Sequence, residues 1–492
     1  MNLTGIVISG NSHPKNLSAV VKGCQLLNIP YDIVDDPKKS SYNFVWIPNR
    51  HLEPSELSEK KIMFGPHFSV FPSHEMIGPI EEKYQNCYYN TLSEWNKELH
   101  KGLKIPLVCL PFGVDTKSFA PNEDKKDFVF VYCKGRHPSL LEAILPKLVN
   151  YKVQVITCGK YTEDWYKMVL AKSKFGIWLG SHESQGFALE EALSSDVPLL
   201  VVDAKSMKDE WHGDFIYKTD SPLKATSVPY WSKDCGELVT LETFDKGLEA
   251  IQNGIYHPRK FVTENLSIHK CLSRMLHHFG FTRNVVLVCS VIKTVTDPLS
   301  YTNTRSVFSQ EERFLQKLET IRSVRAKIPN NYIVHLECSD LSYEYESVIR
   351  ELVDEYINYN DNRVVSKAVK GPFKGLGEST TILEYIKGMN VMCENLWKIS
   401  GRYVINGKFD LLKFKSGNCF KISSGMLSTV LYKIDGKAIT EYVDALESCE
   451  EELKRGKGIE EVLTKKFTNV MTMDEIGVSG KVAVDGNELR DY

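Results

Sequence analysis

One stretch, residues 181–203, restricts the fold of this chain more than any other, because a polar loop, a short helix and a buried strand follow one another there. The apolar run FGIWLG lies just before the loop. Phe187, Leu189 and Leu193 recur at helical spacing, and Pro198 ends the helix before the apolar run LLVV. Buried strands that alternate with helices in this way predict an α/β fold with parallel sheets.

Two glutamates flank the start of this helix. Glu183 precedes it, and Glu191 follows eight positions later, which is about two helical turns. A helix N-terminus presents unpaired N–H groups, and Gly186 allows the close backbone approach with which folds of this kind hold a diphosphate. A pair of glutamates near a helix is commonly just solvated, and Glu190 is predicted to lie on the solvent side.

Ser-Gln-Gly between the acids and Ala-Leu-x4-Pro after them complete a motif that resembles the donor-binding motif of retaining GT-B glycosyltransferases. The resemblance implies that Glu183 binds hydroxyls of the donor sugar and Glu191 hydroxyls of the ribose. A carboxylate can accept two hydroxyl hydrogen bonds at once, which suits both positions. The resemblance also implies that backbone N–H groups meet the phosphates around Ser184, Gln185 and Gly186.

The segment PLVCLPFGVDTKSFAP, residues 106–121, is similar to the interdomain connector of the same family. Pro111 and Gly113 permit a turn between domains, and Phe119 can plug into one of them. With 492 residues the chain is expected to hold two or three domains. The connector predicts a GT-B acceptor lobe at 1–110 and a nucleotide-sugar lobe at 111–280.

The acceptor lobe is predicted to be a small Rossmann-like sheet with strands at 5–10, 31–36, 42–48, 61–65 and 86–91. The loop with Gly10 after the first strand suits an acceptor or a phosphate, unless Gly10 only makes a turn. His67 occupies a place similar to the active-site histidine of many GT-B enzymes; the alternative is a histidine satisfied inside its loop. His74 is a weaker candidate.

The second Rossmann-like lobe is predicted to have strands at 127–133, 151–158, 175–180 and 197–203. Lys134 and Arg136 follow its first strand, and GT-B relatives place a basic pair near this position. Two cations there could stabilise a departing nucleoside diphosphate through charge-assisted hydrogen bonds. Their spacing is compressed relative to the family, and a solvated loop is the alternative. The segment 225–237 looks turn-rich, and helices at 241–254 and 264–280 are expected to pack across both lobes.

A new module is predicted to begin at residue 284 and to extend to 492. Its pattern predicts strands at 284–292, 332–340, 362–366 and 395–407, and helices at 311–328, 343–357 and 375–389. This order is similar to the nucleotide-binding half of GT-A glycosyltransferases. The signatures YTNTRS, KGLGE, KISGRY and GVSGKVAVDG resemble those of viral and bacterial polysaccharide-synthesis proteins. The resemblance implies a GT-A-like α/β domain after the two GT-B lobes.

Where a usual GT-A enzyme carries Asp-x-Asp for a divalent metal, this chain has Lys398 to Arg402. Such a site is poorly supplied with oxygen ligands, so these cations could neutralise a diphosphate directly. Arg305 is a further phosphate candidate, while Glu337 and Asp340 stand where GT-A folds often hold the base or ribose. The alternatives are surface ion pairs and caps, and capping competes with catalysis at Glu378. The acidic stretch 447–453 and the basic KRGKG after it are expected to be a solvated helix and turn.

Composition narrows the function further. The net charge of −2 implies no general attraction to nucleic acid or anionic membrane. Twelve cysteines are scattered without CxxC pairs, which indicates neither a zinc site nor a disulfide framework. Several that lie in apolar runs are expected to be buried thiols: Cys109, Cys133, Cys158 and Cys289. The longest apolar run, VVLVCSVI, is too short to span a membrane, and no signal peptide is recognised. A cytosolic protein is expected, in the host-cell cytoplasm if the chain is viral.

These observations predict a two-module glycosyltransferase that moves sugars from nucleotide-sugar donors to a growing glycan. The first module is expected to retain anomeric configuration and to need no cofactor; for the second, the need for a divalent metal stays open. A GT-B-fold sugar-nucleotide epimerase is one alternative. A protein in which one or both modules only bind glycan is another.

Overall fold

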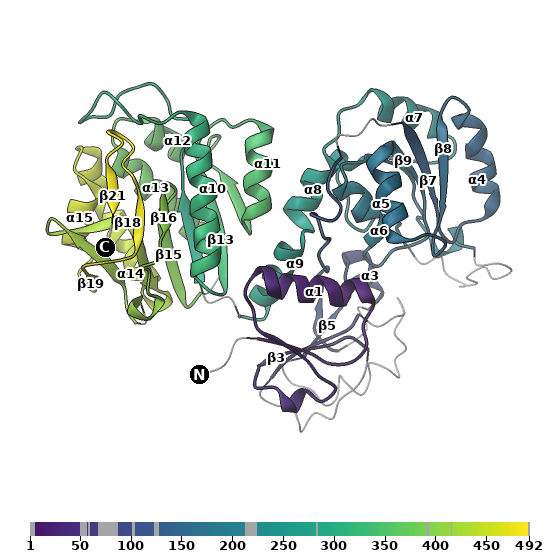
Figure 1. The fold of residues 1–492 in the computed structure, drawn as a ribbon, viewed down its shortest axis with the longest axis horizontal. Helices are drawn as coiled ribbons and strands as arrows, with labels where there is room; N and C mark the ends of the chain where they lie inside the picture. Colours follow the sequence, from purple (N-terminus) through teal and green to yellow (C-terminus); the bar gives the residue numbers. More distant parts are fainter. Residues whose placement is uncertain are drawn as a thin grey trace. The chain divides into compact units, whose positions relative to one another are not determined.

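The computed structural model describes residues 5–49, 57, 60–66, 87–100, 104–122, 127–211, 224–281, 284–389, 393–414 and 416–490. The chain splits into two compact units, Met1–Met275 and Leu276–Tyr492 (Figure 1). His67 and His74 lie outside the described residues. Within the described ranges, no helix is both long and apolar enough to cross a membrane.

The first sheet of unit 1 has six parallel strands in the order β2-β1-β3-β4-β5-β6. The strands are β1 Ile6–Ile8, β2 Tyr31–Ile33, β3 Phe44–Ile47, β4 Lys61–Phe64, β5 Cys87–Asn90 and β6 Leu107–Val108. The helices with it are α1 Pro14–Leu26 and α3 Glu94–Leu99. The five predicted strands are confirmed, and β6 adds an unpredicted strand at the start of the connector.

The second sheet of unit 1 has five parallel strands in the order β11-β10-β9-β7-β8. The strands are β7 Phe128–Cys133, β8 Lys152–Thr157, β9 Ser173–Leu179, β10 Leu199–Val202 and β11 Gly236–Val239. The helices are α4 Pro138–Ile144, α5 Glu163–Lys172, α6 Phe187–Ser194, α7 Phe244–Asn253, α8 Pro258–Asn265 and α9 Ile268–His278. Apolar clusters cover both faces of this sheet. The two parallel Rossmann-like sheets agree with the predicted fold class, while β11 falls partly in the segment predicted to be turns.

The connector is held against the helices that close unit 1. The N–H of Val114 donates to the Leu266 carbonyl (2.7 Å), and the N–H of Ile268 donates to the Val114 carbonyl (3.2 Å). Helix α8 packs on α6. In α1, Gly23 leaves room for Leu272 of α9, which a Cβ at Gly23 would approach to 2.8 Å. The predicted return of the last helices across both lobes is therefore confirmed.

Gly113 is a test of this packing. A Cβ at Gly113 would lie 2.1 Å from the Ile268 Cα, so Gly113→Ala forces the connector and α9 apart. We expect the substitution to lower the unfolding free energy of unit 1 by about 1–3 kcal/mol, measured by urea denaturation. Gly388→Ala, at the end of α13 in unit 2, is the control for the exchange itself: no heavy atom lies within 4 Å of the added Cβ, so it should leave the stability of both units nearly unchanged. Equal stability of the two variants would contradict this account.

Unit 2 is built on a seven-stranded mixed sheet in the order β14-β13-β12-β15-β18-β17-β19, with a small sheet β16-β20-β21 beside it. The strands are β12 Asn284–Cys289, β13 Asn331–Glu337, β14 Glu355–Asn358, β15 Asn395–Ser400, β16 Tyr403–Ile405, β17 Cys419–Ser423, β18 Met426–Asp435, β19 Met471–Met473, β20 Val478–Lys481 and β21 Glu488–Arg490. The helices are α10 Gln310–Lys327, α11 Tyr343–Leu352, α12 Arg363–Lys370, α13 Lys374–Gly388, α14 Ile439–Lys454 and α15 Ile459–Lys466.

Strand β12 shows how the layers of unit 2 form. Val285 and Leu287 face a cluster with α13, α14 and α15, while Val286 and Val288 face a cluster with α10 and α11. Alternate side chains of a strand point to opposite faces, so both faces of the sheet are covered (Figure 1). Strands β12, β13 and β15 are parallel, and their carboxyl ends therefore share one edge of the sheet.

Two predicted elements of unit 2 were wrong. The helix predicted at 343–357 ends at Leu352, and Glu355–Asn358 instead pairs with β13 as β14. The strand predicted at 362–366 lies in helix α12, because the Asn362 side chain accepts hydrogen bonds from the N–H groups of Val364 and Val365 and caps the helix. Short apolar runs fit either structure, and here a neighbouring strand and a cap decide between them.

Candidate functional site

The start of α6 has no side-chain cap. Gly186 precedes the helix with φ of 97°, a left-handed conformation that favours glycine. The N–H groups of an uncapped first turn carry a partial positive charge. An end of this kind suits an anion, and the phosphate-binding role of Ser184, Gln185 and Gly186 stays a prediction.

Glu183 lies beside this helix start and is paired with a lysine from the same sheet. Lys134 directly follows β7, and its Nζ lies 2.6 Å from Glu183 Oε1. The two side chains are 31% and 13% exposed, respectively. Burial lowers the pKa of Lys134, but the Glu183 carboxylate outweighs it, so the net shift of that pKa is upward. The Trp95 indole donates to the Glu183 carbonyl (2.8 Å) and so holds the loop against α3.

Glu191 is paired with a lysine from the other sheet of unit 1. Lys15, in α1, donates to Glu191 Oε1, and its Nζ also lies 3.6 Å from Glu163 Oε2. Burial raises the pKa of Glu191 to about 7, although Lys15 opposes the shift. The two ion pairs therefore bring side chains of both sheets to one helix.

His13 joins the same cluster and was not predicted. Its ring lies parallel to that of Phe187, with centroids 6.3 Å apart, and its Nδ1 accepts a hydrogen bond from the Lys15 N–H. Burial lowers the pKa of His13, and the charges of Lys15 and Lys134 add to the effect. The sequence feature that could have indicated His13 is the loop SGNSH, in which only Gly10 was selected as a candidate. Gly10 lies three residues before His13 and adopts φ of 102°.

Two predicted residues serve the scaffold around this cluster. Arg136 donates through Nη1 to the carbonyls of Gly180 and Val202, each at 3.1 Å, and so joins the ends of β9 and β10. The buried Gln185 side chain accepts from the Phe112 N–H (2.9 Å) and donates to the Phe112 carbonyl. Ser184 lies half-buried in the same loop.

The prediction that Glu190 lies on the solvent side was wrong. Glu190 is fully buried and accepts a hydrogen bond from Gln185 Nε2 at 2.9 Å. Burial raises its pKa well above the usual range. Helix α6 packs on α8 and on its own sheet, so even this position of the helix is covered.

The raised pKa of Glu191 has a measurable consequence. A carboxyl whose pKa rises on folding stabilises the fold fully below about pH 4.5, its unfolded value, and that contribution disappears as the pH rises through about 7. We expect the unfolding free energy of the natural chain to fall by roughly 3 kcal/mol relative to Glu191→Gln between pH 4.5 and pH 8. Urea denaturation of both proteins across this range measures the difference. Parallel pH profiles would contradict the shift.

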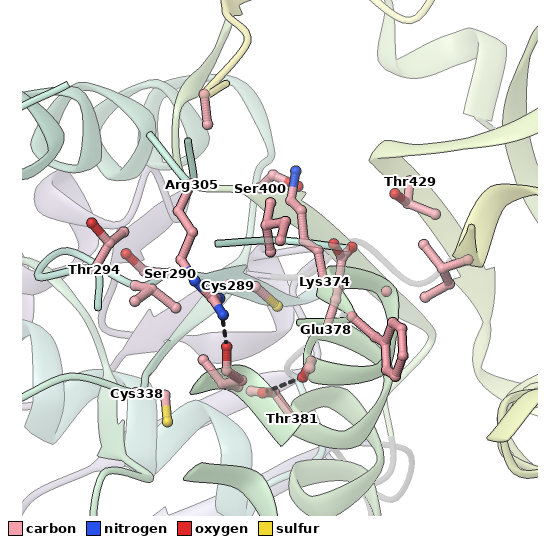
Figure 2. Close-up of a pocket in the computed structure, with 18 of the residues that line it drawn as sticks. Cys289, Ser290, Thr294, Arg305, Cys338, Lys374, Glu378, Thr381, Ser400 and Thr429 are labelled. Atoms are coloured by element: carbon pink, nitrogen blue, oxygen red, sulfur yellow. Dashed lines mark hydrogen bonds between the residues drawn. The ribbon is translucent and has the colours of Figure 1, made fainter. Parts of the chain in front are cut away.

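Unit 2 contains a cavity of about 530 Å³ at the carboxyl ends of its parallel strands. Its lining includes Cys289 of β12, Ser400 of β15 and the residue Cys338 that follows β13. Figure 2 shows Lys374 and Glu378, both from the start of α13, projecting into it near Ser400. Two glutamates, Glu378 and Glu460, line the cavity with seven cations: Lys293, Arg305, Arg313, Lys370, Lys374, Arg402 and Lys457. The cavity is therefore strongly cationic.

The predicted cations of unit 2 differ in what they bind. Arg305 lines the cavity but donates to the carbonyls of Asp297, Val369, Lys370 and Gly371, as Figure 2 shows in part. Lys398 is 1% exposed and donates to Glu378 and to Ser400 Oγ (2.8 Å). Arg402 lines the cavity. Among these three residues, only Arg402 has a side chain that forms no hydrogen bond with the described residues of unit 2, and its Nε is buried.

Two of the predicted acids of unit 2, Glu337 and Asp340, lie away from the cavity lining. Glu337 is buried and accepts hydrogen bonds from the Ile292 N–H (3.0 Å) and Ser339 Oγ (2.7 Å), so it fixes the loops after β12 and β13. Asp340 has a side chain 83% exposed, 3.7 Å from Lys293 Nζ. Glu378, by contrast, lines the cavity, and its pKa is lowered because Lys398 outweighs the effect of burial.

The C-terminal segment was predicted to be a solvated helix and turn, and this was wrong in part. Helix α14 buries Cys449 and Leu453 in the core, and Gly456, Lys457 and Gly458 line the cavity. All twelve cysteines are free thiols, and the prediction that Cys158 is buried was wrong, because this residue, directly after β8, is exposed. Across the described ranges, no group of three or more histidine, cysteine, aspartate or glutamate side chains could hold a metal ion.

Comparison with known proteins yields likenesses of structure alone. No family model matches the chain, and no curated protein is significantly similar to it. Similar solved structures include TarM (14% identity, 48% of this chain and 54% of that one, TM-score 0.34) and a GtfA/B complex (11%, 48% and 57%, TM-score 0.32). The chain thus spans about half the length of each. It is also similar to the apo form of the lipopolysaccharide outer core galactosyltransferase WaaB (14%, 56% and 99%, TM-score 0.37).

Proposed function

We propose that the chain is a glycosyltransferase that binds a nucleotide-sugar donor at the start of α6 and passes the sugar to a growing glycan. The observation that carries this proposal is that two ion pairs lie at α6, a helix whose start has no side-chain cap. Lys134 pairs with Glu183, and Lys15 pairs with Glu191. The helix start and the lysines suit a diphosphate, and the carboxylates suit sugar hydroxyls. All four side chains would thus contact one ligand that has both kinds of group.

The proposed chemistry follows from how these charges compensate one another. Without a donor, each lysine neutralises a glutamate. A diphosphate at the start of α6 competes for Lys134 and Lys15, and the released carboxylates accept hydrogen bonds from the donor sugar (Glu183) and the ribose (Glu191). Lys134 then stabilises the departing nucleoside diphosphate. We expect retention of anomeric configuration without a protein nucleophile, because the departing phosphate can assist the incoming hydroxyl.

We also propose that unit 2 is a second transferase module, and that it works without a metal ion. The observation that favours this is the cationic cavity at the carboxyl ends of β12, β13 and β15, the edge at which α/β sheets bind ligands. The alternative is a module that binds glycan without turning it over. A metal-dependent second module is the outcome that would overturn the proposed mechanism.

One assay tests both proposals. The full chain is incubated with a panel of nucleotide sugars and glycan acceptors, with and without EDTA, and nucleotide release and acceptor mass are measured. We expect transfer that EDTA does not abolish. The absence of both turnover and donor binding would end the transferase proposal, and EDTA-sensitive transfer that persists in Glu183→Ala would overturn the metal-free second module.

A further inference from the structure

The seven cations that line the cavity of unit 2 are not equivalent. Five of them already have partners: carbonyls for Arg305 and Arg313, Asn360 for Lys370, Glu452 for Lys457 and Asp340 for Lys293. Lys374 and Arg402 form neither a hydrogen bond nor an ion pair with any described residue. Arg402 Nε is buried without an acceptor, and its guanidinium lies 5.6 Å from the centre of the Tyr403 ring. Two cations in one cavity are thus left for a ligand.

The charges of Lys374 and Arg402 also act on each other. Lys374 is exposed, but the protein atoms around its ammonium desolvate it and lower its pKa; the charge of Arg402 lowers this pKa further, while Glu378 and Glu460 of the same cavity oppose the shift. Glu378 forms its ion pair with Lys398, and its carboxylate compensates the charges of Lys374 and Arg402 only through longer-range attraction. Like charges held together in a confined space are unfavourable unless an anion compensates them. Their arrangement is therefore suited to an anionic ligand.

Two helix N-termini point to the same ligand class. Helix α13 begins at Lys374 and α15 begins at Ile459, and neither has a side-chain cap. They adjoin, because a Cβ at Gly375 would lie 3.0 Å from the Ile459 nitrogen. Gly375, Gly458 and Ile459 all line the cavity. The positive ends of two helices therefore lie beside the two unpaired cations.

We infer that this cavity binds the diphosphate of a phosphorylated ligand between Lys374, Arg402 and the N-termini of α13 and α15, without a metal ion. A cavity of about 530 Å³ is large enough for a nucleoside or sugar attached to that diphosphate. The inference gives the proposed second module its ligand-binding residues, but the binding would stand even if unit 2 catalysed nothing.

Residue-resolved lysine acylation tests the inference on the full chain. The protein is acylated in EDTA with and without inorganic pyrophosphate, and the labelling rate of each lysine is read by mass spectrometry. We expect pyrophosphate to protect Lys374 at least about fivefold, while Lys293, which is more than half exposed, changes little. Because each lysine is read separately, a failure here is distinct from a failure of the site at α6. Unchanged labelling of Lys374 at saturating pyrophosphate would overturn the inference.

Matched variants separate a specific site from general attraction. Lys374→Gln and Arg402→Gln should each weaken pyrophosphate binding by about tenfold or more in a background that carries Lys134→Gln, which weakens the first site. Lys293→Gln removes an equal charge from the same cavity wall and should change affinity less than about threefold. Equal losses in all three variants would overturn the inference. Lys374→Arg keeps the charge and should retain most of the affinity for pyrophosphate. A nucleoside diphosphate and a hexose 1-phosphate are then each used to compete with pyrophosphate, and the stronger competitor identifies the source of the phosphate.

Discussion

Glu183→Ala is expected to lower sugar transfer by the first module by a factor on the order of 10³, while unit 1 keeps its fold. The proposed role of Glu183 is to accept hydrogen bonds from the donor sugar as it departs, and alanine removes both acceptors. The fold survives because the backbone contacts of residue 183 do not depend on its side chain: its N–H donates to the Thr226 carbonyl, and its carbonyl accepts from Trp95. The measurement is the initial rate of acceptor glycosylation at saturating donor.

The control for this prediction is Glu142→Ala, because Glu142 is an exposed glutamate of α4 in the same unit. We expect its transfer rate to equal that of the natural chain. The melting temperature of both variants checks that unit 1 is folded. Unchanged transfer in Glu183→Ala would refute the role assigned to Glu183. If Glu183→Ala loses both its transfer rate and its melting transition, the variant is unfolded, and the transfer rate of Glu183→Gln then decides the question.

Lys398→Met is expected to destabilise unit 2 by about 3–5 kcal/mol, because it leaves the Glu378 carboxylate in a confined site without its main cation. Lys398 is 1% exposed, and its ammonium also donates to Ser400 and to the Thr429 carbonyl, so water cannot take its place. Hydrogen exchange of β15 and β18 amides in urea measures the loss in this unit alone. The result would show that Lys398 holds the base of the cavity together.

A double-mutant cycle gives this prediction its control. Adding Glu378→Leu to Lys398→Met removes the unpaired carboxylate, so the double variant should regain much of the lost stability. Lys293→Met, at an exposed cation of the same cavity, should change stability by less than about 0.5 kcal/mol. A double variant that is no more stable than Lys398→Met would contradict the ion-pair account.

The strands could be predicted from the sequence because their apolar runs are buried on both faces, as Val285 to Val288 show. Periodicity failed at Glu190, because α6 is a short helix that is covered even at that polar position. It failed again at 343–366, where a neighbouring strand and the Asn362 cap decide the structure. These failures share one cause. In each case the contact that determines the local structure comes from residues outside the short segment whose apolar pattern was used for the prediction.

The same limit applies to the candidate sites. Glu183, Glu191 and Lys134 could be selected because they stand next to strands and a helix of one sheet. Lys15 could not, because 176 residues separate it from the glutamate that it binds. In unit 2, Lys374 and Lys457 meet in one cavity only through the adjoining starts of α13 and α15. No local motif reports which distant cations remain without a partner after folding.

The two ion pairs at α6 differ in a way that bears on motion within unit 1. Lys134 and Glu183 belong to the same sheet, but Lys15 reaches Glu191 from α1 of the other sheet. Any hinge opening between the sheets must break the second pair and can leave the first intact. Lys15–Glu191 thus joins the two lobes, and a donor bound as proposed would break this ion pair by drawing Lys15 to its phosphates. Donor occupancy would then weaken one contact between the lobes, while the hydrogen bond from the Trp95 indole to the Glu183 carbonyl would remain.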